Sequence, residues 1–281
     1  MEAVTTGRAG FELLGRQYPP AAGVSFEHLV LAGVPCTWVR PGKTLTEEVI
    51  VYIHGGAFIY GSLESHAPMV SHIASALERN ILLIGYRLAP EHPFPAGIDD
   101  GIAVINALRT TYPAIRFGMI GDSAGGNLSI AIQLQLRELG GTRPCYSILV
   151  SPWVDLTCTN ASYNTNQDKD IMLNRPYLEW AAGLYAGTTP LNTALLSPVY
   201  ASLEGLAPVQ ILYGTAEILA GDSIQLYQRL VAAGVKAELL AFEAEQHVWP
   251  FMDIDTRAAQ QALQAMHTFA GEHQSTTQEA L

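Results

Sequence analysis

Short, continuously apolar segments rich in Val, Ile and Leu alternate along this chain with segments of helical length. A continuous apolar run predicts a strand buried on both faces, and strand–helix alternation predicts a mainly parallel sheet with helices on each side. The predicted strands of this sheet are residues 49–53, 81–86, 117–120, 145–150, 209–213 and 237–242. The predicted helices are residues 69–78, 98–111, 124–139, 223–233 and 255–270. The sequence therefore predicts an α/β fold around a mostly parallel central sheet.

Two segments depart from this alternation. The first 24 residues hold one short helical pattern, at 11–16, which two prolines end, and residues 25–31 and 36–40 then form a predicted hairpin. A polar stretch that becomes apolar and helical over 177–185 falls between two predicted strands, where a lid or cap is expected. We expect an N-terminal part of a small helical cap at 1–24, a cap insertion at 159–198, and a catalytic α/β core at 25–158 and 199–281.

Composition excludes several classes of function. The chain has 281 residues, which suits one large α/β domain, and its 26 acidic against 15 basic residues give a formal net charge of −11. An acidic surface repels phosphate backbones, so we expect no nucleic-acid partner. The sequence contains no run of about 18 apolar residues, and its N-terminus has no basic segment followed by an apolar run. We therefore expect no membrane span, no signal peptide and a cytoplasmic location. Three scattered cysteines, Cys36, Cys145 and Cys158, indicate reduced thiols and no metal site.

The strongest motif is Gly121-Asp122-Ser123-Ala124-Gly125, a G-x-S-x-G pattern between a predicted strand and a predicted helix. The glycines allow a very tight strand-to-helix turn that exposes the serine at the strand end. We interpret Ser123 as a nucleophile and expect Asp122 to fix a neighbouring loop by hydrogen bonds. The structural alternative is a turn of small residues that lets the helix pack closely on the sheet.

A second motif, His54-Gly55-Gly56-Ala57-Phe58, directly follows the predicted strand at 49–53. Adjacent glycines after a strand let backbone N–H groups turn toward a developing oxyanion. The alternative is an ordinary glycine turn. The motif lies one strand–helix–strand unit before Ser123, however, and this position favours the oxyanion role. We expect His54 to be a buried imidazole that orders the loop.

The base and acid follow the last two predicted strands. His247 lies between the final strand and the final helix, and Glu217 follows the strand at 209–213, at the edge where open α/β sheets place their catalytic groups. The order Ser123, Glu217, His247 is that of the α/β-hydrolase triad. Asp222 also follows the strand at 209–213, but it precedes a predicted helix, so we interpret it as an N-cap.

The chain resembles the bacterial hormone-sensitive-lipase family of esterases. The resemblance is carried by stretches from the first parallel strand to the last helix: His54-Gly55-Gly56-Ala57-Phe58, Tyr86-Arg87-Leu88-Ala89-Pro90-Glu91, Phe94-Pro95-Ala96, Gly121-Asp122-Ser123-Ala124-Gly125-Gly126-Asn127 and Ser151-Pro152-Trp153. It implies an α/β-hydrolase fold and a Ser123–Glu217–His247 triad. It also implies that the oxyanion donors are the N–H groups of Gly56, Ala57 and Ala124. We expect Arg87 and Glu91 to form a buried pair with a scaffold role.

Three departures from this family pattern stand out. Ala57 occupies the place of a third glycine, Glu217 that of an aspartate, and the residues before Ser25 have room for about one cap helix where the family has two. With a short N-terminal cap, we expect short acyl chains of roughly two to eight carbons. Apolar candidates to line the substrate pocket are Phe58, Ile171, Met172, Trp180, Leu184, Tyr185 and Val248.

The resulting prediction is a serine carboxylesterase that acts on a small-molecule ester without a cofactor or metal. Two alternatives stay open: a non-catalytic receptor for small ligands on the same fold, and an amidase or peptidase with the same triad. The sequence also leaves a homodimer open.

Overall fold

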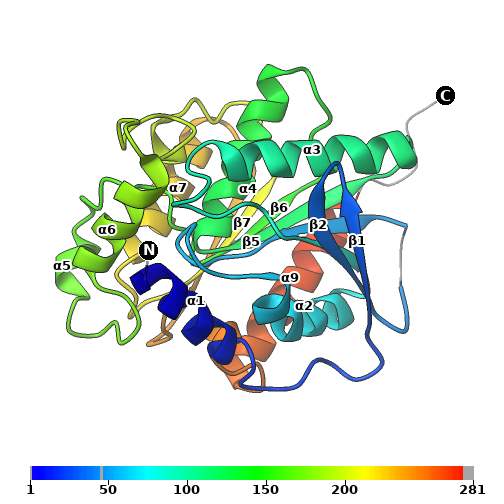
Figure 1. Cartoon of the computed structure of the whole chain (residues 1–281), viewed down its shortest axis with the longest axis horizontal. Helices are drawn as coiled ribbons and strands as arrows, with labels where there is room; N and C mark the ends of the chain where they lie inside the picture. The colour runs from blue at the N-terminus through cyan, green and yellow to red at the C-terminus, as the bar shows by residue number, and fades with distance from the viewer. Residues whose placement is uncertain (1, 45–46, 275–281) are drawn as a thin grey trace.

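The computed structural model describes residues 2–44 and 47–274, and within them eight strands form one sheet in the order β1-β2-β4-β3-β5-β6-β7-β8 (Figure 1). The strands are β1 (Ser25–Leu31), β2 (Val34–Arg40), β3 (Val49–Ile53), β4 (Asn80–Ile84), β5 (Phe117–Asp122), β6 (Ser147–Val150), β7 (Val209–Gly214) and β8 (Ala237–Phe242). The β1–β2 and β2–β4 pairs are antiparallel, and the remaining pairs are parallel. The predicted mostly parallel α/β sheet is therefore confirmed.

Helices cover both faces of this sheet, as Figure 1 shows. One face carries α2 (Leu63–Leu77) and α9 (Arg257–His273), and the other carries α3 (Ala96–Thr111), α4 (Ala124–Glu138) and α7 (Ala220–Ala232). Each face of the sheet packs against its helices in a hydrophobic core of its own, and alternate side chains of β3 point into the two cores. Val51 packs on the side of α3 and α4, and Ile50 packs on the side of α2 and α9. The central strands are therefore buried on both faces, which explains their continuous apolar sequence.

The observed boundaries differ from the predicted ones mainly at helix starts. Helix α2 begins at Leu63 and not at 69, because the Ser62 hydroxyl accepts from the N–H groups of Glu64 and Ser65 and Ser65 reciprocates in a capping box. Pro68 lies inside the helix. Strand β4 ends at Ile84, two residues earlier than predicted.

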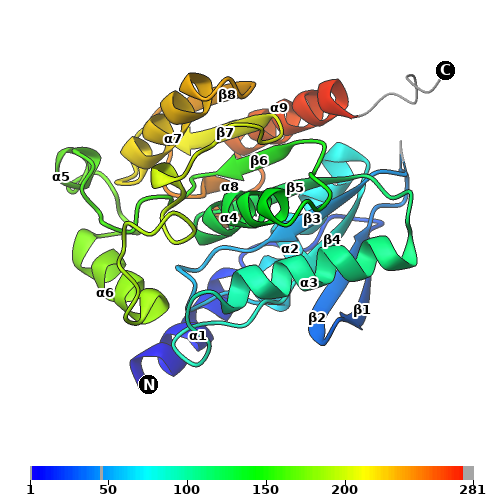
Figure 2. The ribbon, with the colours of Figure 1, turned by 90° about the horizontal axis from the view of Figure 1, so that it is seen from above.

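Helix α1 (Glu2–Leu14) and the helices of residues 159–198, α5 (Ser162–Thr165) and α6 (Arg175–Ala186), lie at the same end of the sheet in both views (Figures 1 and 2). Helix α1 is longer than the predicted pattern at 11–16. Two short helices complete the described fold, η1 (Pro198–Tyr200) and α8 (Trp249–Met252). No helix in the described ranges is long and apolar enough to span a membrane.

Arg8 holds α1 against the core. Its guanidinium donates to the carbonyl oxygens of Ile59 and Ala89 and forms an ion pair of 2.7 Å with Glu91. The expected Arg87–Glu91 pair is therefore wrong. Arg87 instead donates from Nε and Nη2 to the Asp100 carboxylate, while Glu91 pairs with Arg8.

Candidate active site

Ser123 lies in a strained turn between β5 and α4. Its backbone has φ 52° and ψ −120°, a combination that costs a non-glycine residue about 1–3 kcal/mol. The turn is possible because a Cβ at Gly121 would overlap the Gly125 carbonyl, and a Cβ at Gly125 would overlap Ile53. The glycines of the motif therefore allow β5 to turn directly into α4 and to present the Ser123 hydroxyl.

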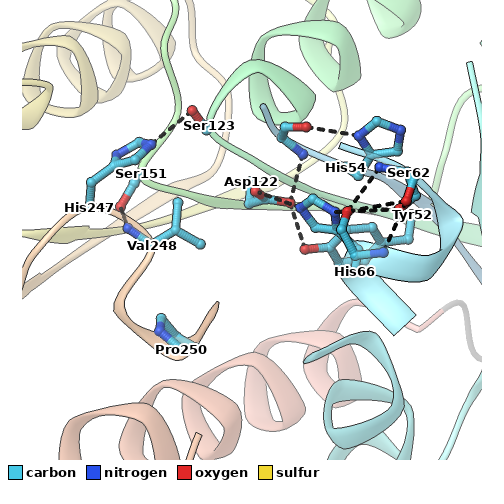
Figure 3. A network of polar contacts seen from close by, with 12 residues as sticks. Tyr52, His54, Ser62, His66, Asp122, Ser123, Ser151, His247, Val248 and Pro250 are labelled. Atoms are coloured by element: carbon cyan, nitrogen blue, oxygen red, sulfur yellow. Dashed lines mark hydrogen bonds and ion pairs between the residues drawn. The ribbon is translucent and has the colours of Figure 1, made fainter. Parts of the chain in front are cut away.

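His247 and Glu217 continue a line of hydrogen bonds from Ser123, part of which Figure 3 shows. The His247 Nε2 atom lies 2.9 Å from Ser123 Oγ, and His247 Nδ1 lies 2.7 Å from Glu217 Oε2. A carboxylate only accepts, so Nδ1 carries the proton and Nε2 is free to accept from the serine. The structure thus brings together the three residues that the sequence placed in a triad.

Glu217 is fully buried. Burial raises the pKa of this carboxyl, and its hydrogen bond and charge interaction with His247 oppose that rise. The Gly214 N–H also donates to Glu217 Oε1 over 3.2 Å. The side chain therefore spans from the end of β7 to the loop between β8 and α8 that holds His247, here called the histidine loop.

Asp222 lies away from this line. It sits inside the first turn of α7, and its carboxylate accepts from the N–H groups of Val154 and Asp155 and from the Asn160 amide. The prediction of an N-cap is wrong, because α7 begins at Ala220 and its N-cap position is Leu219. Burial raises the pKa of Asp222 to about 8, although hydrogen bonds from backbone N–H groups favour the ionised form and oppose this rise. Asp222 therefore connects the cap insertion to the core.

The histidine loop depends on a residue that the sequence analysis did not assign. Val248 has a left-handed backbone (φ 47°), and its N–H donates to Ser151 Oγ over 3.1 Å. Ser151 directly follows β6 and also has a positive φ of 49°. The sequence signal that could have indicated this role is the position of Ser151 in the Ser151-Pro152-Trp153 stretch, directly after a strand.

The loop after β3 has an unusual backbone. Gly56, Ala57 and Phe58 have φ values of 110°, 53° and 65°. Glycine adopts such values readily, but each of the other two residues costs about 1–2 kcal/mol. The Gly56 carbonyl accepts from the N–H groups of Ile59 and Tyr60, which closes the loop on itself.

Hydrogen bonds hold Gly55, at the start of this loop, from two sides. Its N–H donates to Asp122 Oδ1 over 3.0 Å, and its carbonyl oxygen lies 2.8 Å from His54 Nδ1. A carbonyl only accepts, so His54 is protonated on Nδ1. Burial, and next the neighbouring His66, lower the pKa of His54 to about 3, so its ring is neutral at neutral pH. Gly56, Ala57 and Ser123 all line one cavity, and Ala124 starts α4 beside Ser123.

This cavity has a volume of about 380 Å³ and opens beside Ser123 and His247. Its walls come from α1, from the cap insertion and from the histidine loop. The lining residues outside the Ser123 turn and the loop after β3 are Gly7, Gly10, Phe11, Leu14, Tyr60, His66, Met172, Leu173, Tyr177, Leu178, His247, Val248 and Phe251. Asp122, next to Ser123 in the sequence, also lines the cavity.

Met172 and Val248 are the candidate pocket residues that line this cavity. The structure places the other five elsewhere. Phe58 stacks on Tyr185 in the core, with ring centroids 3.8 Å apart, and Leu184 packs against the same core. Ile171 and Trp180 are 84% and 39% exposed. The sequence analysis missed the lining residues of α1, which the helical spacing of Gly7, Phe11 and Leu14 signals.

Within the described ranges, no group of three or more His, Cys, Asp or Glu side chains could hold a metal ion.

Comparisons with known proteins show which proteins this chain is similar to in sequence and in fold. Residues 50–251 match a family of proteins with the α/β-hydrolase fold. The chain is 34% identical to an acetyl-hydrolase of Streptomyces hygroscopicus, over 90% of this chain and 85% of that protein. It is 31% identical to an esterase of Acinetobacter venetianus, over 94% of this chain and 87% of that one. A crystal structure of an esterase from the bacterial hormone-sensitive-lipase family superposes with a TM-score of 0.93 at 34% identity, covering 96% of this chain and 91% of the other.

Proposed function

The chain belongs to the α/β-hydrolase family of bacterial hormone-sensitive-lipase esterases and is a carboxylic ester hydrolase, and we propose that it cleaves short-chain acyl esters with a Ser123–His247–Glu217 triad. The observation that carries this proposal is the line of two short hydrogen bonds, 2.9 Å and 2.7 Å, that joins the three side chains at the wall of a cavity. The line supplies a nucleophile, a base and a carboxylate in the order that acyl transfer requires.

The proposed reaction has two halves. His247 Nε2 takes the proton of Ser123 as the hydroxyl oxygen attacks the ester carbonyl, and Glu217 stabilises the imidazolium that forms. His247 then gives this proton to the leaving alcohol, which leaves an acyl group on Ser123. Water, deprotonated by the same imidazole, attacks the acyl group, and His247 returns the proton to Ser123 as the acid leaves.

The N–H groups of Gly56, Ala57 and Ala124 are the proposed donors to the oxyanion of both tetrahedral intermediates. The positive φ values of Gly56 and Ala57, and their place beside Ser123 in the wall of the cavity, support this role. The loss of one such donor typically costs about 3–4 kcal/mol of transition-state stabilisation.

The cavity supports short acyl chains as substrates. Its volume of about 380 Å³ is near the lower end of ligand pockets, and its lining is mainly apolar. The Streptomyces relative is named as an acetyl-hydrolase, which agrees with a short acyl group. Helix α1 and the insertion at 159–198 act as the cap in this proposal.

Replacement of the nucleophile tests the proposal. Ser123→Ala should remove nearly all hydrolysis of p-nitrophenyl butyrate and leave the melting temperature close to that of the wild type, because alanine fits the same turn. An organophosphonate should label the wild type at Ser123 and leave the variant unlabelled, as mass spectrometry would show. Labelling of another serine, with activity retained in the variant, would refute the assignment.

A further inference from the structure

Asp122 is a buried carboxylate beside the nucleophile that takes no part in the proposed proton transfers. Its Oδ1 atom accepts from Gly55 N (3.0 Å) and from the Tyr52 hydroxyl (2.8 Å). Figure 3 shows Asp122 between Ser123 and the side chains of Tyr52 and His66. Because Gly55 begins the loop that carries two proposed oxyanion donors, Asp122 connects the position of that loop to the serine turn.

His66 faces the second oxygen of this carboxylate. The His66 side chain, in the first turn of α2, is fully buried, and its Nε2 atom lies 3.5 Å from Asp122 Oδ2. Its Nδ1 atom lies 3.0 Å from Ser65 Oγ. Among the residues that the structure describes, Nε2 makes no hydrogen bond, so its polar contact there is this approach to Asp122. At 3.5 Å this contact is a charge interaction, which a proton on Nε2 makes attractive to the carboxylate.

Aromatic side chains hold the His66 ring in place. The ring centroid lies 5.8 Å from that of Phe11, 4.9 Å from that of Phe251 and 5.1 Å from that of His54. Phe11, Phe251 and His66 all line the cavity beside Ser123. The imidazole is therefore fixed between the cavity wall and Asp122 and cannot easily turn away.

The charge on Asp122 is consistent with this arrangement. Burial alone would raise the pKa of Asp122, but the interaction with His66 and the Tyr52 hydrogen bond hold it below its usual value. An ionised carboxylate is a stronger acceptor for the Gly55 N–H than a neutral carboxyl group.

The peptide between Gly55 and Gly56 determines where one oxyanion donor points. In a trans peptide the carbonyl and the N–H point in opposite directions. His54 holds the Gly55 carbonyl on one side, so the Gly56 N–H must face the other. Asp122 holds the N–H of Gly55 and His54 holds its carbonyl, so both backbone groups of Gly55 are fixed. A displaced Asp122 carboxylate would release the N–H.

We propose that His66 is a positioning residue of this esterase: its Nε2–H holds the Asp122 carboxylate against Gly55 N–H, and so keeps the N–H groups of Gly56 and Ala57 directed at the oxyanion. This inference rests on the proposed function. The oxyanion exists only in the transition state and the tetrahedral intermediates, so His66 should contribute to kcat and much less to KM.

Two substitutions of His66 separate position from packing. His66→Phe keeps an aromatic ring between Phe11 and Phe251 but removes the donor, and kcat for p-nitrophenyl acetate should fall about 10- to 100-fold. KM should stay within about twofold, which indicates a loss confined to the transition state. His66→Gln places an amide nitrogen near the position of Nε2 and should recover most of the loss. His72→Phe, the same change farther along α2, is the control and should retain the wild-type kcat.

A transition-state analogue and a double-mutant cycle complete the test. A trifluoromethyl ketone, whose adduct with Ser123 carries an oxyanion, should bind the His66→Phe variant more weakly by the factor by which kcat/KM falls. In an Asp122→Asn background, His66→Phe should change kcat by no more than about twofold, because residues that act through one contact are not additive. His66→Asn, whose amide reaches only the place of Nδ1, serves as the loss variant if the phenylalanine variant does not fold.

Three results would overturn the inference. They are a wild-type kcat in the loss variant, a glutamine variant as impaired as the loss variant, and an undiminished effect in the Asp122→Asn background. A wild type that hydrolyses no ester would overturn the proposed function and this inference together. An active wild type with an equally active His66→Phe variant would overturn the inference alone.

Discussion

Glu217 is fully buried beside an imidazole, and burial of a carboxyl group favours its neutral form. In the proposed mechanism the same residue must be ionised to stabilise an imidazolium on His247. The two demands are reconciled by the hydrogen bonds from His247 and Gly214, which favour the charged form. The net effect still raises the pKa of Glu217, so the folded state holds this proton more tightly than the unfolded chain does.

Replacement of Glu217 should therefore separate activity from stability. Glu217→Gln keeps the shape but cannot accept from both His247 Nδ1–H and Gly214 N–H, so kcat should fall by roughly 10⁴-fold. A raised folded pKa means that ionisation of Glu217 reduces the stability of the wild type as pH rises above its unfolded pKa, about 4.3. The melting temperature of the variant, relative to the wild type, should accordingly improve between about pH 4 and pH 7.

Calorimetry across this pH range, with kcat measured alongside, checks the Glu217 prediction. Glu243→Gln makes the same chemical change at an exposed position and should alter neither quantity. A Glu217→Gln variant that loses relative stability as pH rises would contradict it.

At the scale of elements, α1 and the cap insertion provide the cavity walls that the α/β core lacks. Helix α1 contributes Gly7, Gly10, Phe11 and Leu14, and it is held on the core by Arg8. The two glycines differ, because a Cβ at Gly7 would overlap the Tyr60 ring whereas a Cβ at Gly10 meets no atom within 4 Å. Gly10 is thus a point where the cavity can be narrowed without disturbing the fold.

We expect Gly10→Leu to shorten the acyl chain that the enzyme accepts. The ratio of kcat/KM for p-nitrophenyl octanoate to that for the acetate should fall about tenfold, because the new side chain extends from the cavity wall. The melting temperature should rise, since leucine is favoured over glycine in a helix by roughly 0.5–1 kcal/mol. Gly183→Leu, at an exposed glycine of α6 with equally open surroundings, is the control. An unchanged chain-length profile in Gly10→Leu would place substrate elsewhere.

Asp222 connects three elements, and its removal should affect stability more than catalysis. Asp222→Ala leaves the N–H groups of Val154 and Asp155 and the Asn160 amide without their acceptor. Buried groups left unpaired cost about 1–3 kcal/mol each, so the melting temperature should fall by several degrees while kcat changes little. Asp222→Asn retains one oxygen for the two backbone donors and should lose less. A large loss of kcat at an unchanged melting temperature would instead make Asp222 part of the catalytic machinery.

At the scale of the molecule, the site is assembled at one edge of a single sheet. Ser123 follows β5, Glu217 follows β7 and His247 follows β8, and the cap elements come from residues far apart in the chain. Because β5, β6, β7 and β8 are successive parallel neighbours in the sheet, the carboxyl ends of β5, β7 and β8 lie at the same edge. Residues of α1 and of the cap insertion line the cavity at this edge. Figure 2 shows α1 and α6 at the same end of the sheet.

The size of this cavity predicts the substrate range of the whole enzyme. Across a series of p-nitrophenyl esters, kcat/KM should be highest for acyl chains of roughly two to eight carbons, because longer chains exceed the enclosed volume. Initial rates below the micelle-forming concentration of each ester would measure this range. Faster turnover of the palmitate than of the butyrate would contradict it.

The local patterns of the sequence were enough to predict the fold class, the succession of strands along the chain and the three residues of the hydrogen-bonded line, Ser123, His247 and Glu217. Each depends on short-range signals: apolar runs of strand length, glycines around a tight turn, and polar residues directly after strands. The membership in a family of carboxylic ester hydrolases follows from the same motifs and is confirmed by the comparisons. The domain boundaries and the roles of the site residues stay predictions.

Only the tertiary structure decided which residues surround the site. Arg87 pairs with Asp100 and not with Glu91. Phe58 and Tyr185 stack on each other in the core. His66 faces Asp122 from α2, a helix that the sequence analysis predicted to start six residues too late. These contacts join residues between 13 and 127 positions apart, as in the Arg87–Asp100 and Phe58–Tyr185 pairs. No local pattern encodes them, because an apolar or ionisable side chain is equally compatible with several partners until packing brings one of them within reach.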